Sequence, residues 1–234
     1  MKVLIIIPAF NEEESLCNVV KNLKSAAPDV DYLIVNDCST DRTEALCQEH
    51  DFNYITFPVN LGIGGGVQAG YLYAVENGYD IAIQMDGDGQ HDPNYIKDVI
   101  KPLQDGTADM VIGSRFITKD GFQSSAMRRL GIGFLKFLIR ICCGTTVNDT
   151  TSGFRATSRS LTKFFAKNYA QDYPEPEAII AAVLEGYRVT EVPVIMHERQ
   201  GGESSINALK SIYYMIKVSL AILIYRLGNL KKKG

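Results

Sequence analysis

Short apolar runs rich in branched side chains alternate along this chain with stretches of helical periodicity, and this rhythm restricts the fold more than any other feature. The first run, KVLIIIP, spans residues 2–8, and its unbroken apolar character is typical of a parallel strand covered on both faces. Similar runs occupy residues 32–35, 54–57, 81–85 and 110–112, separated by helical stretches near 41–50, 65–77 and 93–104. The pattern predicts an α/β fold, with a Rossmann-like, mostly parallel sheet and helices on both faces.

The first helix is expected directly after the first run. Asn11 is a suitable N-cap residue, and the run Glu12 to Glu14 would fill the first turn, where the helix dipole favours acidic side chains. The residues expected on the buried face of this helix stand at helical spacing: Leu16, Val19, Val20 and Leu23.

Composition excludes several classes of protein. With 46% hydrophobic and 22% charged residues, the chain matches a globular domain and excludes disorder, collagen and a multi-span membrane protein. The 234 residues fit a main domain over 1–204, followed by an amphipathic helical tail over 205–234. An odd set of five cysteines without a C-x-x-C pair, and a first apolar run that stops at Pro8, favour a reducing, cytoplasmic location without a disulfide frame or structural zinc.

The charge is small overall but unevenly distributed. A formal net charge of −3, from 24 basic and 27 acidic residues, excludes a globally basic nucleic-acid binder. Residues 121–148 hold four bases and no acid, and residues 204–234 hold six bases and no acid. The chain is therefore expected to present two kinds of surface, one suited to an extended anionic partner and the other to a cation.

Polar residues cluster directly after the predicted strands. Ligands bind beyond the carboxyl ends of the strands in an open α/β sheet. The segments found there are PAFNEEE after the first run, NDCSTDRT after the second, DGDGQHDP after the fourth and GSRF after the fifth. Asp37, Asp86 and Asp88 are therefore expected to converge on one crevice.

The segment DGDGQ places Asp86, Asp88 and Gln90 at alternate positions. In an extended segment these side chains would turn to one side, and hard oxygen ligands of this kind suit Mg²⁺ or Mn²⁺. The flanking glycines leave room for a ligand. The alternative is a polar turn before a helix, which fits Asp92 as N-cap and Pro93 at the first helical position.

Spacing excludes an EF-hand and leaves only a weak signal for a dinucleotide site. Counted from Asp86, an EF-hand would need Gly and Glu where the chain has His91 and Lys97. The loop Asn60 to Gly66 resembles a phosphate loop, but residues 58–63 separate its glycines from the preceding strand, whereas a dinucleotide site needs them immediately after it. We interpret these glycines as close backbone packing at a helix start.

Taken together, these segments resemble family 2 glycosyltransferases with the GT-A fold, and among them the dolichyl- or polyprenyl-phosphate sugar transferases. PAFNEEE resembles the P-x-x-N-E opening, NDCSTDRT the D-D-G-S-x-D segment, DGDGQHDP the D-x-D-x-Q-H-x-P motif, DTTSGFR the S-G-F-R element and HERQGGESS the R-x-x-G-x-S close. The resemblance runs from Lys2 to about Ile206. The second segment departs from the family by Asn36 and Cys38, where Asp and Gly are usual, and the base is left open between uracil and guanine.

The resemblance implies a role for each matching position. The nucleotide pocket would be lined by Pro8, Ala9, Asn11 and Glu12, with Asp37 on the base or ribose. Mg²⁺ or Mn²⁺ would be held against the donor diphosphate by Asp86, Asp88 and Gln90, and Arg199 and Ser204 would close over that diphosphate. The acceptor phosphate would meet Arg115, Arg128 and Arg129.

The chemistry expected is a single in-line displacement that inverts the anomeric carbon, with the leaving diphosphate neutralised by metal and cations. A phosphate acceptor is already anionic and needs no general base. A hydroxyl acceptor needs one, and Asp149 or Glu177 is the candidate. Glu177 is explained equally well as a first-turn helix residue favoured by the dipole.

The basic stretch 121–148 predicts an amphipathic helix. At 100° per residue, Arg129, Lys136 and Arg140 fall within a stripe of about 40°. The opposite side carries Leu130, Phe134, Leu135, Phe137, Leu138 and Ile141. This pattern fits a helix lying on an anionic membrane surface, or an ordinary surface helix with a cationic exposed face.

The stretch 211–227 is apolar but interrupted by Lys217 and Arg226, which leaves less than the roughly 20 residues that span a bilayer. It predicts a second interfacial helix or an oligomer contact, and any membrane association would be peripheral.

The function expected is metal-dependent, inverting transfer of a sugar from a UDP- or GDP-sugar to a polyprenyl or dolichyl phosphate at the inner face of the membrane. The alternative acceptor is a hydroxyl of a lipid-linked glycan in cell-wall or capsular polysaccharide synthesis. A nucleotidyltransferase would carry a glycine-rich, Arg-containing loop after its first strand, and PAFNEEE has no glycine. A non-catalytic nucleotide-sugar binding module also stays open.

Overall fold

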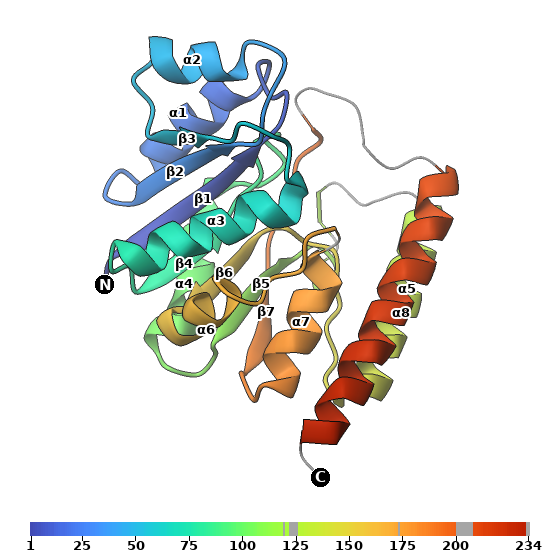
Figure 1. The fold of residues 1–234 in the computed structure, drawn as a ribbon. Coiled ribbons are helices and arrows are strands. Elements are labelled where there is room, and N and C mark those ends of the chain that lie inside the picture. The colour runs from blue at the N-terminus through green and yellow to red at the C-terminus, as the bar shows by residue number, and fades with distance from the viewer. Residues whose placement is uncertain (119, 122–125, 173, 200–207, 233–234) are drawn as a thin grey trace.

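The computed structural model describes the whole chain except residues 119, 122–125, 173, 200–207 and 233–234. Figure 1 shows a central sheet with helices on both faces and two long helices, α5 and α8, side by side at one edge of the molecule. The expected domain boundary after residue 204 lies outside the described residues.

Within the described residues the sheet has seven strands: β1 (Val3–Ala9), β2 (Asp31–Asn36), β3 (Tyr54–Thr56), β4 (Ile81–Gln84), β5 (Met110–Ser114), β6 (Arg155–Ser158) and β7 (Val189–Pro193). Their order is β3-β2-β1-β4-β6-β5-β7. Neighbours are parallel, except that β6 is antiparallel to both β4 and β5. Each expected run contains a strand, so the mostly parallel sheet is confirmed. Strands β6 and β7 lie outside the expected runs, because neither RATS nor VTEVP is a continuous apolar run.

The helices of the described residues are α1 (Leu16–Ala26), α2 (Thr43–Glu49), α3 (Gly62–Glu76), α4 (Ile96–Gln104), α5 (Ala126–Cys143), α6 (Arg159–Phe165), α7 (Pro174–Leu184) and α8 (Ala208–Lys232). A 3₁₀ turn, Pro93–Tyr95, leads into α4, and the Asp92 side chain accepts a hydrogen bond from the backbone N–H of Asn94. The predicted cap at Asp92 is therefore confirmed.

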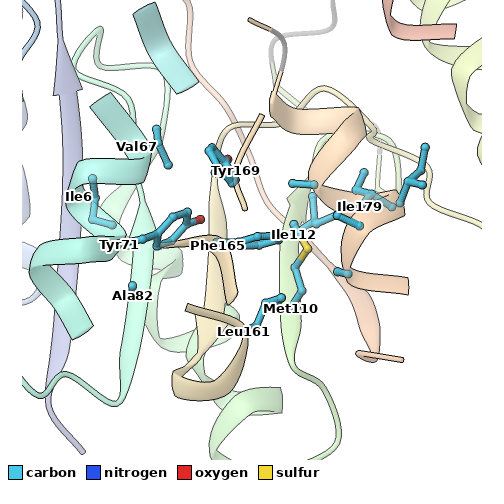
Figure 2. Packing of buried hydrophobic residues seen from close by; sticks show 14 of the residues in the cluster. Ile6, Val67, Tyr71, Ala82, Met110, Ile112, Leu161, Phe165, Tyr169 and Ile179 are labelled. Carbon is cyan, nitrogen blue, oxygen red and sulfur yellow. The ribbon is translucent and has the colours of Figure 1, made fainter. Parts of the chain in front are cut away.

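Alternate residues of the central strands pack on opposite faces of the sheet, because successive side chains of a strand point to opposite sides. Leu4 and Ile6 of β1 join a buried cluster with α3, α6 and α7, part of which is drawn in Figure 2. Ile5 and Ile7 pack on the other face with α1 and α4. All four side chains have no exposed surface, which confirms a first strand covered on both faces.

The first helix begins later than expected. It starts at Leu16, so Asn11 is not its N-cap and the three glutamates precede it. Asn11 has a φ of 57°, in the left-handed region that Asn tolerates. Its Oδ1 accepts a hydrogen bond from the backbone N–H of Thr40 at 2.8 Å. The predicted cap is wrong because this side chain binds a loop that is distant in the sequence.

The glycines at the start of α3 serve close backbone packing, as predicted. The Gly64 N–H donates to the carbonyl oxygen of Gln171 at 3.1 Å. A Cβ on Gly64 would lie 2.2 Å from the carbonyl oxygens of Ala170 and Gln171. This distance is too short for any residue with a side chain. The helix therefore abuts the segment after α6 directly.

Helices α5 and α8 pack on each other, and α8 also packs on α7. Leu135 and Ile139 of α5 meet Val218 and Ile222 of α8 in the same buried cluster. Nine other large apolar side chains of the pair are exposed among the described residues: Leu130, Phe134, Phe137 and Ile141 of α5, and Ile216, Leu220, Leu223, Ile224 and Leu227 of α8. Both helices are therefore amphipathic in an unusual sense, with one apolar row buried and another facing outward.

Candidate active site

The loops after β1, β2 and β4 meet at the carboxyl edge of the sheet. The N–H of Asp37 donates to the carbonyl oxygen of Ala9 at 2.9 Å, which joins the first two loops. Gly87 lies against the first loop, because a Cβ there would be 3.2 Å from the Pro8 carbonyl oxygen and 3.5 Å from Glu12 Cγ. The predicted convergence of these three segments is therefore present.

The segment DGDGQ forms a turn instead of the expected extended stretch. Gly89 has a φ of 78°, and Asp88 Oδ1 accepts a hydrogen bond from the N–H of Gln90 at 3.0 Å. The alternation argument is wrong for this segment, yet Asp86 and Asp88 both lie near Glu12, whose ionisation they oppose. The Gln90 side chain donates to the carbonyl oxygen of His197 at 3.4 Å.

Arg199 is bound to this acidic group. Its Nε donates to Asp88 Oδ2 at 2.9 Å, and a terminal nitrogen lies 3.6 Å from Glu12 Oε1. Burial raises the pKa of Glu12 to about 7, and Asp88 and Asp86 add to the rise, whereas the hydrogen bond from Ser15 and the charge of Arg199 oppose it. The predicted diphosphate clamp and the predicted metal ligand are therefore in direct contact.

Ser15 ties two of the loops together. Its hydroxyl donates to the carbonyl oxygen of Gly87 at 2.7 Å and lies 2.9 Å from Glu12 Oε2. The side chain has no exposed surface. Sequence reasoning missed this residue because a single serine before a helix has no distinguishing signal.

Asp37 holds the start of α3. Its two carboxylate oxygens accept the N–H groups of Leu61 and Gly62 at 2.6 Å and 2.8 Å. The side chain is 4% exposed. The residue expected on the base or ribose thus lies at the carboxyl edge, with both oxygens already bonded to backbone.

Arg115 and Asp149 form a buried ion pair. Arg115 Nε and a terminal nitrogen each lie 2.7 Å from one oxygen of Asp149, a two-point contact. The side chains are 6% and 0% exposed. Glu191 of β7 holds the loop that carries Asp149, because its carboxylate accepts hydrogen bonds from the backbone N–H groups of Asn148 and Asp149. The expected acceptor ligand and the expected general base are therefore bound to each other.

The other predicted positions are more scattered. Glu177 belongs to the first turn of α7, where burial raises its pKa, Asp172 adds to the rise and Lys217 of α8 opposes it. Arg129 is exposed on α5. Lys136 belongs to the expected basic stripe, but its ammonium group is partly buried and donates to Asn148 Oδ1 at 2.6 Å. Ser204 and the Arg128 side chain lie outside what the structure describes.

The two aspartates fit a hard divalent cation that is completed by a substrate. Among the described residues, no three His, Cys, Asp or Glu side chains converge tightly enough to hold a metal alone. Mg²⁺ usually takes one or two carboxylates together with substrate phosphates, and Asp86 and Asp88 supply that number beside the cationic Arg199. The donor set therefore suits a metal that arrives with a diphosphate.

Comparison with known proteins assigns the family. A family model described as "Glycosyl transferase family 2" matches residues 4–165. The chain is a family 2 glycosyltransferase. It is 32% identical to an undecaprenyl-phosphate mannosyltransferase of Micrococcus luteus over 88% of each chain. It is 33% identical to a UDP-N-acetylglucosamine–dolichyl-phosphate N-acetylglucosaminyltransferase of Methanococcus voltae, with 82% of this chain and 84% of the relative covered.

The solved structures support the GT-A fold of this glycosyltransferase. Glucosyl-3-phosphoglycerate synthase from Mycobacterium tuberculosis, in complex with Mn²⁺, UDP-glucose and phosphoglyceric acid, superposes with a TM-score of 0.73 at 20% identity, over 97% of this chain and 80% of that one. Within the described part of the glycosyltransferase, none of the helices has the length and apolar character needed to cross a bilayer.

Proposed function

We propose that this glycosyltransferase moves a sugar from a UDP- or GDP-linked donor to a polyprenyl or dolichyl phosphate, with inversion. The observation that carries the donor side is the contact between Arg199 and Asp88 at the carboxyl edge of the sheet. Carboxylates can bind a divalent metal, and a neighbouring arginine can bind phosphate oxygens. Together they form the kind of site that binds a metal and a diphosphate. The names of the relatives support the acceptor side.

Charge stabilisation of the leaving group is the chemistry that this site would supply. Asp86, Asp88 and Gln90 would hold Mg²⁺ or Mn²⁺, which neutralises a departing diphosphate when bound. Arg199 would pass from Asp88 to the diphosphate, so that its guanidinium meets the negative charge that develops there. Solved neighbours with Mn²⁺ or Mg²⁺ and UDP support divalent metal use in this fold.

A phosphate acceptor matches the state of Asp149. Both of its oxygens accept hydrogen bonds from Arg115, so a role as general base would compete with this buried ion pair. A lipid phosphate is anionic and needs no base, and the exposed Arg129 would attract it. Transfer to a hydroxyl of a lipid-linked glycan would require Asp149 or Glu177 to act as base, and the acceptor assay below separates the two.

The direct test supplies the purified protein with UDP- and GDP-sugars, Mn²⁺, and undecaprenyl or dolichyl phosphate in vesicles. Formation of a lipid-linked sugar is expected. The donor is identified by thermal denaturation with each nucleotide sugar, because a ligand at 100 times its Kd stabilises the folded state by about 2.7 kcal/mol. Transfer to hydroxyl acceptors alone would reject the lipid-phosphate proposal.

Peripheral contact with the cytoplasmic face of a membrane is part of this proposal. At 100° per residue, the exposed apolar residues form a stripe about 60° wide on α5 and about 100° wide on α8. The exposed Arg129 and Arg140 lie beside the stripe of α5. The basic residues also disfavour pairing of two copies through this surface, and they favour anionic lipid headgroups.

Replacing Phe137 and Leu220 together by Glu should weaken binding to anionic vesicles by at least about 10²-fold. Each large side chain withdrawn from lipid forfeits about 1.5–3 kcal/mol. Vesicle sedimentation measures the effect, with Leu72→Glu as the control, because Leu72 is a similarly exposed apolar residue on α3. Binding that is equal in the two variants and insensitive to salt would contradict a membrane role for this surface.

A further inference from the structure

Gln84 is a fully buried polar side chain at the end of the central strand β4. Burying a carboxamide is costly unless its polar atoms find partners. Its Nε2 donates to Asp86 Oδ1 at 3.1 Å, and its Oε1 accepts from the Tyr169 hydroxyl at 3.5 Å. The last residue of the strand is therefore directed at the first carboxylate of the DGDGQ turn.

Gly153 closes the other side of the same carboxylate. A Cβ at this position would lie 2.7 Å and 2.9 Å from the two oxygens of Asp86, and 3.0 Å from Gln84 Nε2. Gly153 belongs to the SGFR segment, which leads into β6, where Arg155 pairs with Gln84. Because Gly153 has no side chain, the Asp86 carboxylate occupies the space that a Cβ at this position would take.

His91 supports Asp86 from its own turn. The backbone N–H of Asp86 donates to His91 Nδ1 at 3.0 Å. Since Nδ1 accepts this bond, the ring proton is assigned to Nε2, which lies 3.8 Å from Asp86 Oδ2. The ring is 7% exposed and stacks on Phe154 of the SGFR segment, with ring centres 5.3 Å apart.

The two aspartates are thus held in different ways. Asp86 is contacted by Gln84 of β4, by Gly153 just before β6 and by His91 of its own turn, whereas Asp88 binds the partly exposed Arg199. We propose that Gln84, Gly153 and His91 are positioning residues that fix Asp86 for a metal–diphosphate complex, while Asp88 exchanges its arginine for the metal. This inference rests on the metal site of the proposed function, and it gives the SGFR segment a role in the donor site.

The test compares Gly153→Ala with Gly133→Ala. Gly133 is a matched control on α5, because a Cβ there would meet no atom of the described residues within 4 Å. Mn²⁺ is titrated into the full chain with UDP or GDP present, and free Mn²⁺ is followed by electron paramagnetic resonance. Loss of a group that orients a metal ligand typically weakens metal binding 10–100-fold, and this loss is expected for Gly153→Ala alone, with thermal unfolding recorded on the same samples.

Gln84→Met provides the second arm, in case Gly153→Ala does not fold. Met has a similar volume and lacks the N–H donor, so about a 10-fold loss of Mn²⁺ affinity is expected. Wild-type affinity in folded Gly153→Ala, or in Gln84→Met, would overturn the positioning role alone. Failure of the wild type to bind Mn²⁺ with either nucleotide would overturn the proposed metal site, and this inference with it.

Discussion

Asp88→Asn is expected to lower sugar transfer by about 10³-fold while the protein stays folded. A catalytic metal contributes several kcal/mol of transition-state stabilisation, and each 1.36 kcal/mol is a factor of ten in rate. Asn keeps an oxygen for the N–H of Gln90, which Asp88 now binds at 3.0 Å, but it brings no charge to a metal or to Arg199. Steady-state transfer to lipid phosphate at saturating donor measures the loss.

Asp92→Asn is the matched control, because it removes the same charge four residues later. Asp92 caps the turn before α4 through the N–H of Asn94, and Asn caps about as well as Asp. We therefore expect near wild-type transfer from this variant. Equal activity in the Asp88 and Asp92 variants would contradict the assignment of Asp88 to the donor site.

Breaking the buried pair of Arg115 and Asp149 is expected to have the largest effect on stability. Arg115→Met leaves a fully buried carboxylate without its guanidinium, and the loss of one partner of a buried pair costs about 3–5 kcal/mol. Asp149→Asn leaves a buried guanidinium without its carboxylate. The double variant should be destabilised by clearly less than the sum of the single effects, because neither unpaired charge remains. Urea denaturation of the four proteins measures the cycle.

The exposed pair of Arg42 and Glu49 is the control, with side chains 65% and 52% exposed. Arg42→Met should cost less than about 1 kcal/mol, as exposed pairs do. Strict additivity in the Arg115 cycle would contradict the structural pairing. Loss of transfer with unchanged stability in Arg115→Met would instead show that Arg115 serves the acceptor. Arg129, which is exposed, is the better position for testing acceptor phosphate binding alone.

Strands β1 to β5 and the donor-site segments were predictable because their signals are local. A run such as VLIIIPA can be covered on both faces only inside a sheet, and Asp86 and Asp88 follow such a run directly. β6 has no such signal: Arg155 is fully buried but donates to the carbonyl oxygens of Ser152, Glu175 and Thr150. A charged residue whose partners come from other segments looks, in sequence, like a surface residue.

Local pattern misled where a side chain had a distant partner. Asn11 is a residue type that often caps helices, yet its side chain binds Thr40. Lys136 continues a basic stripe in the sequence, yet its ammonium group binds Asn148. The reverse holds for Gln84, whose position in an apolar run could have been noticed as a buried polar group in need of a partner. Its partner, Asp86, is only two residues away, but Gly153 comes from across the sheet.

The sequence by itself determined the layered α/β fold, the family and the edge of the sheet that carries the carboxylates, because hydrophobic periodicity and motif order are properties of neighbouring residues. Only the tertiary structure decided the state of the charged groups. Arg199 is bound to Asp88, Arg115 is bound to Asp149, and Asp86 lies between Gln84 and Gly153. Each of these contacts joins segments brought together by strand pairing and loop packing, and the partner of a buried charge depends on which groups the fold places within hydrogen-bond distance.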